Sequence, residues 1–256
     1  MTLKSLWLED LTWPEVRAAL DAGVDTALIV VGATEQHGPH LPLAVDTLCG
    51  RAIAERVARR LDRAVIAPVV SVGYSPYHMH LPGTLTIGRE TMIALLTDYC
   101  TSLARHGFRN LAILSSHGGN NRPIARAVEA IGPQVPDVRV VAFVDGSAYG
   151  RVQRATAARF GITPPVAGVH AGEAETSQVL AIRPELVVGN AIEPGYVGNL
   201  ADAREQLARD PASVSPSGVL GDPRPARAER GAAYLDDLAD YIAEWLLPRL
   251  LMPPID

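Results

Sequence analysis

The sequence contains little cysteine, few aromatic residues and no long apolar run. Only Cys49 and Cys100 are cysteines among 256 residues, which excludes a disulfide framework and a cysteine-rich zinc site. No run reaches the roughly 18 apolar residues that a membrane-spanning helix needs. The first residues also lack an apolar core of signal-peptide length. We therefore expect a protein of the reducing cytoplasm that does not enter a membrane.

Strong positive charge is absent as well. The formal net charge is −5, whereas surfaces that bind nucleic acid are usually basic, so a nucleic-acid partner is not expected. Hydrophobic residues make up 48% of the chain and charged residues 20%, which is typical of a globular enzyme and excludes global disorder. The length is close to the upper limit for one hydrophobic core, so we expect a single domain over residues 1–256.

Short apolar runs alternate with helical patterns through the first part of the chain. Strands are predicted over residues 26–32, 64–70, 110–116 and 138–144, with helices between them. This alternation predicts an α/β fold with a parallel sheet that is covered on both faces. Residues 145–169 are interrupted by glycine and proline and are expected to pack near the mouth of the site. A helix is expected after His170, irregular structure over residues 184–225, and a last helix near 226–247.

Polar residues follow the first and third expected strands, where a parallel sheet places its ligands. Glu35 and His37 are two residues apart and would point the same way in an extended backbone. Asp46 opens the next helix and can fold back toward them, and His117 can add a nitrogen ligand. Carboxylates and imidazoles without a thiolate suit zinc, manganese or iron. The alternative is that Glu35 is a surface charge and Asp46 only a helix cap.

Other residues near these motifs are candidates for substrate binding. Gly118 and Gly119 permit close approach of a ligand to the backbone. Asn120 could hold a substrate carbonyl, or it could cap the next helix. The long loop of residues 71–88 carries Tyr77 and His78, which could line the mouth of a site.

Five motifs in a fixed order resemble those of the creatininase (creatinine amidohydrolase) family. The resemblance runs from residue 26 to about residue 235, and it implies a three-layer α/β/α sandwich with a mainly parallel central sheet. It also implies a centre with two divalent metal ions per chain and a homo-oligomer, often a hexamer. The matching pieces are Glu35-Gln-His-Gly-Pro-His-Leu-Pro42 with Asp46, Pro82-Gly-Thr84, His117-Gly-Gly-Asn120, His170-Ala-Gly-x-x-Glu-Thr-Ser177 and Gly218-Val-Leu-Gly-Asp-Pro223.

The resemblance assigns roles to individual residues. Glu35, Asp46 and His117 resemble the ligands of one metal, and His37 and Asp46 resemble ligands of the second, with Asp46 bridging. His170 resembles the acid/base histidine beside the substrate.

One ligand of the family pattern is missing from this chain. The family's third motif reads His-x-Glu, but Gly119 stands at the glutamate position. Glu175, or as a weaker candidate Glu173, could supply the missing carboxylate or move a proton. The family's substrate-covering tryptophans are also missing near the fourth motif, which disfavours creatinine itself as the substrate.

The predicted activity is metal-dependent hydrolysis of a C–N amide bond in a small molecule, cyclic amides included. His170 would protonate the leaving nitrogen. One alternative is a peptidase that trims a precursor peptide during maturation of a redox cofactor of mycofactocin type. A formamide deformylase is another, and it would need Arg122 and Arg151 to face a phosphate. A non-catalytic small-molecule binding domain is disfavoured because nucleotide-binding glycine motifs are absent from the sequence.

Overall fold

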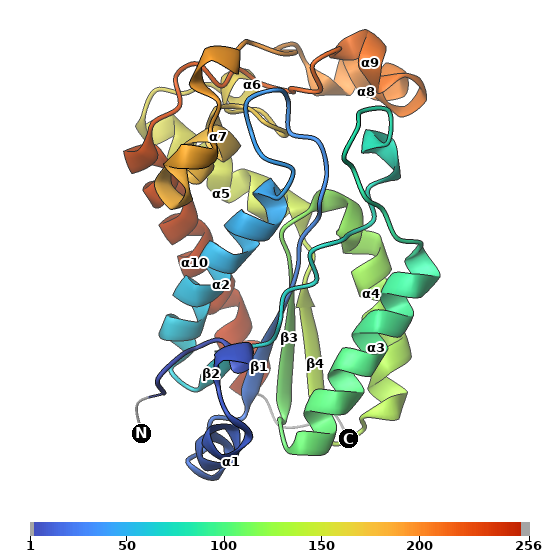
Figure 1. Ribbon diagram of the computed structural model, residues 1–256, viewed down its shortest axis with the longest axis vertical. Coiled ribbons are helices and arrows are strands. Elements are labelled where there is room, and N and C mark those ends of the chain that lie inside the picture. Colours follow the sequence, from blue (N-terminus) through green and yellow to red (C-terminus); the bar gives the residue numbers. More distant parts are fainter. Residues whose placement is uncertain (1–2, 252–256) are drawn as a thin grey trace.

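A computed structural model describes residues 3–251, and its centre is a four-stranded parallel sheet (Figure 1). The strands stand in the order β2-β1-β3-β4, which confirms the predicted α/β class. Their bounds are β1 Thr26–Val31, β2 Ala64–Ile66, β3 Asn110–Ser115 and β4 Arg139–Phe143. All six residues of β1 are buried, which accounts for its continuous β-branched and aliphatic sequence.

Helices cover both faces of the sheet. Leu28 and Val30 of β1 pack with α2 (Val45–Leu61), α5 (Gly146–Arg159) and α10 (Ala228–Leu251). Ile29 and Val31 point to the other face, where α1 (Trp13–Asp21), α3 (Arg89–His106) and α4 (Asn121–Ile131) pack. Helix α7 (Glu173–Ile182) lies against α2 and α10. The chain therefore has the three layers that the sequence predicted.

Strands β1 and β3 run in register and end at the same level. Thr26 pairs with Asn110 at one end, and Val31 pairs with Ser115 at the other. The loop after each strand therefore leaves from one edge of the sheet, as expected for polar motifs that share a site. Figure 1 shows the segments with α6 to α9 lying above this edge.

Two segments contain more helix than predicted. Residues 145–169, for which the sequence predicted no helix, form α5 and the short helix α6 (Pro164–Ala167). Asp145 caps α5 by accepting a hydrogen bond from the Ala148 amide at 2.9 Å, and buried contacts with α10 offset the weak helix propensity of its glycines. Residues 184–225, also predicted irregular, include α8 (Leu200–Arg209) and α9 (Pro211–Val214).

The remaining elements are single turns of 3-10 helix. They are η1 Leu8–Asp10, η2 Pro76–His78, η3 Gly118–Asn120, η4 Gly132–Gln134, η5 Pro184–Leu186 and η6 Gly189–Ala191. Strand β2 is shorter than the predicted 64–70. Val70 pairs with β1 only through an isolated bridge with Val31. Within residues 3–251, no helix is both long enough and apolar enough to cross a bilayer.

Candidate metal centre

The loop after β1 and the start of α2 place two carboxylates and one histidine together. The side chain of Glu35 is 1% exposed, and its backbone amide donates to the Leu43 carbonyl at 2.9 Å. His37 is fully buried, and its Nδ1 donates to the Glu35 carbonyl at 3.1 Å, which leaves Nε2 free to face the site. Asp46 lies in the first turn of α2, where the helix dipole favours a negative charge.

His117 follows β3 and approaches the same carboxylates. Its Nε2 donates to the Tyr74 carbonyl at 3.2 Å, so Nδ1 is the unprotonated nitrogen in the neutral ring. Nδ1 lies 3.3 Å from Glu35 Oε1 and 3.4 Å from Asp46 Oδ2. Tetrahedral ligands about 2.0–2.1 Å from a zinc ion stand about 3.3–3.4 Å apart, so these separations fit a shared metal.

Glu175 completes a second group on the other side of Asp46. Its Oε2 accepts a hydrogen bond from the Ala171 amide at 2.6 Å and lies 3.7 Å from His37 Nε2. His37 Nε2 is also 3.9 Å from Asp46 Oδ1. The two oxygens of Asp46 therefore face different histidines, which is the arrangement that a bridging carboxylate needs.

Several atoms of this cluster are buried without a hydrogen-bond partner in the part of the chain that the structure describes. They are both carboxylate oxygens of Glu35, Nε2 of His37 and Oδ2 of Asp46. Buried polar atoms are normally paired, since an unpaired one costs about 1–3 kcal/mol. Three groups have ligand atoms within 4.8 Å of one another and could each hold a cation: Glu35 with Asp46 and His117, His37 with Asp46 and Glu175, and Glu35 with His37 and His170. The residues present therefore fit a divalent metal centre.

The charges of the cluster shift the pKa of its members in opposite directions. Burial lowers the pKa of His117, but the carboxylates of Asp46 and Glu35 raise it to about 11. Burial raises the pKa of Glu175 to about 7, with repulsion from Asp46 adding to the effect and His37 opposing it. Burial also raises the pKa of Glu35, but the neighbouring histidines, with His117 foremost, bring it below its ordinary value. In the absence of a cation, bound protons offset part of the negative charge of these carboxylates.

His170 stands beside the ligands with one nitrogen free. Its Nε2 is 2.7 Å from the Gln36 carbonyl oxygen, which can only accept, so Nε2 carries the proton. The Gln36 side-chain nitrogen lies 2.9 Å from both His170 Nε2 and His78 Nδ1, and with His170 Nε2 protonated it donates to His78. His170 Nδ1 is left as an acceptor and lies 3.8 Å from Glu35 Oε1. Burial, together with His37 and His78, holds the pKa of His170 well below its usual value, so the ring is neutral.

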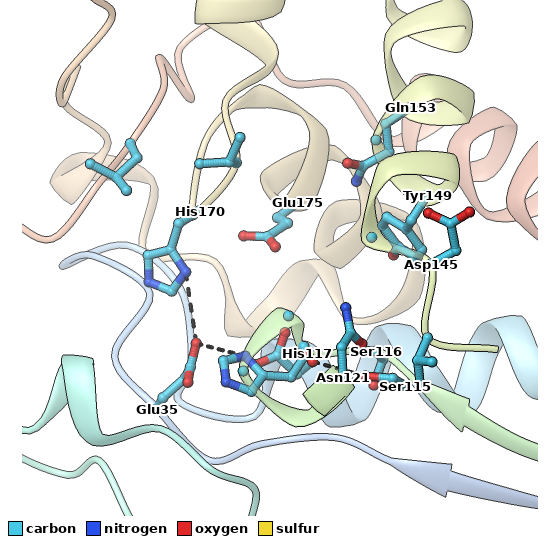
Figure 2. Close-up of a pocket in the computed structure, with 18 of the residues that line it drawn as sticks. Glu35, Ser115, Ser116, His117, Asn121, Asp145, Tyr149, Gln153, His170 and Glu175 are labelled. Carbon is cyan, nitrogen blue, oxygen red and sulfur yellow. Dashed lines mark hydrogen bonds and ion pairs between the residues drawn. The ribbon is translucent and has the colours of Figure 1, made fainter. Parts of the chain in front are cut away.

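A cavity of about 440 Å³ opens onto these groups. Figure 2 shows Glu35, His117, His170 and Glu175 reaching toward it from separate elements. Its far wall comes from α5, through Tyr149, Gln153 and Arg154. A volume of this size is within the range of small-molecule sites, about 300–1,000 Å³.

The family model described as Creatininase: Creatinine amidohydrolase matches residues 9–246. The chain belongs to the creatininase family. It is 36% identical over 91% of its length to the Mycofactocin precursor peptide peptidase of Mycobacterium ulcerans, of which it covers 86%. It is 30% identical over 94% of its length to the Creatinine amidohydrolase of Pseudomonas putida, covering 96% of that protein. The solved structure named Creatininase Mn superposes with a TM-score of 0.83 at 28% identity, over 97% of this chain and all of the other.

Membership in the creatininase family fixes the general activity. The chain is a metal-dependent amidohydrolase, a hydrolase acting on carbon–nitrogen bonds. The manganese in one solved relative's name and the buried ligand groups here support a divalent metal ion as the cofactor.

Of the predicted site residues, His37, Tyr77, Asn120 and Glu173 do not line this cavity. Glu173 is fully buried between α7 and α10, where it accepts hydrogen bonds from Ser177 Oγ at 2.9 Å and Tyr234 Oη at 2.7 Å. Asn120 is also fully buried, and its side chain joins loops by accepting from the Tyr74 amide at 2.8 Å and donating to the Gly32 carbonyl at 2.9 Å. It makes no side-chain cap of α4 either.

The two glycines of the third motif have different surroundings. Gly118 lines the cavity, and a Cβ there would meet nothing within 4 Å. A Cβ at Gly119 would lie 2.3 Å from the Tyr74 carbonyl oxygen and 2.4 Å from His117 Nε2. Glycine at position 119 is therefore required by the close approach of two loops, and the position has no room for the family's glutamate.

Residues 145–169 lie at the cavity, as expected, but sequence reasoning missed the helix α5 and the side chains that it contributes. These are Tyr149, Gln153 and Arg154, and only the capping Asp145 before the helix could have signalled them. Arg122 and Arg151, the examples given for a phosphate-binding deformylase, are exposed and do not line the cavity.

Proposed function

We propose that this protein hydrolyses the C–N bond of a small amide at a centre of two divalent ions per chain, drawn from zinc, manganese and iron. Glu35, Asp46 and His117 would hold one ion, and His37, Asp46 and Glu175 the other. The observation that supports this most is that buried, unpartnered oxygen and nitrogen atoms of Glu35, His37 and Asp46 lie together with ligand atoms of His117 and Glu175. Such ions, when bound, lower the pKa of water toward about 7 and polarise a carbonyl group.

His170 is the proposed proton carrier. Its Nδ1 faces the centre, and the bond from Nε2 to the Gln36 carbonyl holds the ring in one orientation. In the reaction the water oxygen bonds to the amide carbon and its proton passes to Nδ1. The C–N bond then breaks, and the same proton moves from the imidazolium to the departing nitrogen. The ring ends neutral, as it began.

Other residues would orient the substrate. His78 stacks on His170 with ring centres 4.4 Å apart and closes the cavity beside Glu35. Gly118 leaves room on the opposite side because it has no side chain. Tyr77, at 57% exposure, lies at the outer rim. The proposal also includes assembly as a homo-oligomer, a hexamer by resemblance, in the cytoplasm.

A second candidate function is cleavage of an amide bond in a peptide. The observation that favours it is the 36% identity, over most of both chains, to the Mycofactocin precursor peptide peptidase of Mycobacterium ulcerans. The chemistry at the metal centre would be the same for both substrates, so the two candidates differ in the molecule that the cavity admits.

The test is a hydrolysis assay of the metal-loaded protein on creatinine, formamide, acetamide and a short unstructured peptide. We expect His170→Asn to lower kcat by about 10²–10⁴-fold, the usual contribution of a general acid–base group, with unchanged metal content. His106→Asn, at the exposed end of α3, is the matched control and should keep full activity. Hydrolysis of none of these amides, or equal rates in the His170→Asn variant, would contradict the proposal.

A further inference from the structure

A second cavity of about 270 Å³ adjoins the metal centre. It lies between η2, which contributes Tyr77, and the α8–α9 segment, which contributes Leu207 and Pro211. In Figure 1 the loop with η2 rises toward α8 and α9 at the same end of the molecule as the metal centre. The proposed reaction steps take place outside this second cavity.

The second cavity adjoins the proposed reaction site. His78 and Leu220 line both cavities and stand between them. His78 Nε2 is 3.5 Å from Glu35 Oε1, and its ring stacks on that of His170. A group in the second cavity would therefore lie one side chain away from a proposed metal ligand and from the proton carrier.

Several polar atoms on the wall of the second cavity already have partners. Gln36 Oε1 accepts from the Gly38 amide at 3.0 Å, and its nitrogen donates to His78. Ser215 Oγ donates to the Val219 carbonyl at 2.8 Å, and His80 Nδ1 donates to the Tyr77 carbonyl at 3.2 Å.

The rest of the wall is apolar. Leu207, Pro211, Leu220 and the ring of Tyr77 line it, and none of its described lining side chains is Lys, Arg, Asp or Glu. A charged group placed there would lose its hydration without gaining a partner of opposite charge among these side chains. The chemistry of the wall therefore fits an uncharged, apolar group.

On the basis of the amide hydrolysis proposed above, we propose that this cavity is a second substrate subsite. It takes an aliphatic or aromatic group that is covalently attached to the amide whose C–N bond breaks at the metal centre. The volume lies below the range of about 300–1,000 Å³ for whole ligands, so it suits one side-chain-sized part of a larger molecule. The substrate is then an elongated amide that occupies both cavities past His78, in contrast to a compact ring such as creatinine.

The test compares two probes that differ only in an apolar tail, acetamide and 4-phenylbutanamide. Metal-loaded protein is titrated with each by calorimetry, and ammonia release is measured in parallel. Burial of the phenyl group predicts at least about tenfold tighter binding of 4-phenylbutanamide. Leu207→Trp, which fills the cavity, and Leu207→Asp, which places a charge in it, should both remove that preference while leaving acetamide hydrolysis unchanged. Glu205→Trp, exposed on the same helix, is the matched control and should keep the preference.

The outcomes separate this inference from the proposed function. Equal affinity for the two probes, or a preference that survives in both Leu207 variants, overturns the subsite while acetamide hydrolysis still supports the reaction. Hydrolysis of neither probe contradicts the proposed function, and the subsite with it. Preference for the tailed amide that is lost in the Leu207 variants and kept in Glu205→Trp supports the subsite.

Discussion

Replacing Thr176 by valine removes the hydroxyl that joins α7 to the loop of His37. Thr176 Oγ1 lies 2.9 Å from His40 Nε2, and both side chains are fully buried. Burial, with His37 adding to it, lowers the pKa of His40 to about 4, so the ring is neutral at pH 7. Valine keeps the shape of threonine but leaves the buried imidazole nitrogen without a partner, which costs about 1–3 kcal/mol.

For a chain of this length, each kcal/mol corresponds to about 2–4 °C in Tm, so the Thr176→Val variant should melt about 2–12 °C lower. Metal binding should weaken as well, because His37 comes from the loop and Glu175 from α7, and both belong to one ligand group. Thr176→Ser is the control. It keeps the hydroxyl and loses one buried methyl, which costs about 1 kcal/mol.

Thermal melting and competition with a chelator measure the two effects. The reasoning requires weaker metal binding in Thr176→Val than in Thr176→Ser. It is refuted if the valine variant binds metal as tightly as the serine variant and melts within about 1 °C of the wild type.

Three further predictions concern the metal ligands. Gly119→Ala should lower Tm and metal affinity together, because its Cβ would displace His117 or the Tyr74 carbonyl, whereas Gly118→Ala should change neither. His117→Ala and His37→Ala should each abolish metal retention while far-ultraviolet circular dichroism stays unchanged. Metal loading at pH 7.5 should release about one proton or more per chain, and metal affinity should rise with pH. The reason is that a ligand nitrogen must be unprotonated, whereas the pKa of His117 in the metal-free protein is raised to about 11. Calorimetry in buffers of different ionisation enthalpy measures this release.

Each of these predictions has a contrary outcome. Equal stability of the alanine variants at positions 118 and 119 would mean that the two loops can separate without cost. Normal metal content in both histidine variants would place the metal elsewhere. Loading without proton release would mean that His117 is already neutral in the metal-free protein.

Most of the fold, and the meeting of the candidate ligand side chains at one edge of the sheet, could be predicted from the sequence because both depend on local patterns. The β-branched run of β1 and the apolar run of β3 are buried in register, so residues 35–46 and His117 meet at one edge of the sheet. A short polar motif directly after a buried strand must lie near the edge of the sheet where that strand ends. The position of this kind of site can therefore be predicted.

The choice between Glu173 and Glu175 could not be made from the sequence. The two residues are two positions apart on α7, and helical geometry turns such residues to different sides. Only the packing of α7 on α10 decides which one faces the metals, and it turns Glu173 to Tyr234. The second cavity could not be predicted from the sequence either. It forms where α8 and α9 meet a loop more than 100 residues earlier in the chain.

Metal content per chain tests the central claim most directly. It is measured by elemental analysis of the wild type, Glu175→Gln and the control Glu173→Gln. The account predicts about two ions in the wild type and in Glu173→Gln, and about one in Glu175→Gln, because only Glu175 approaches His37 and Asp46. Unchanged content in Glu175→Gln would contradict its role as a ligand, and a wild type that retains no divalent metal would contradict the metal centre itself.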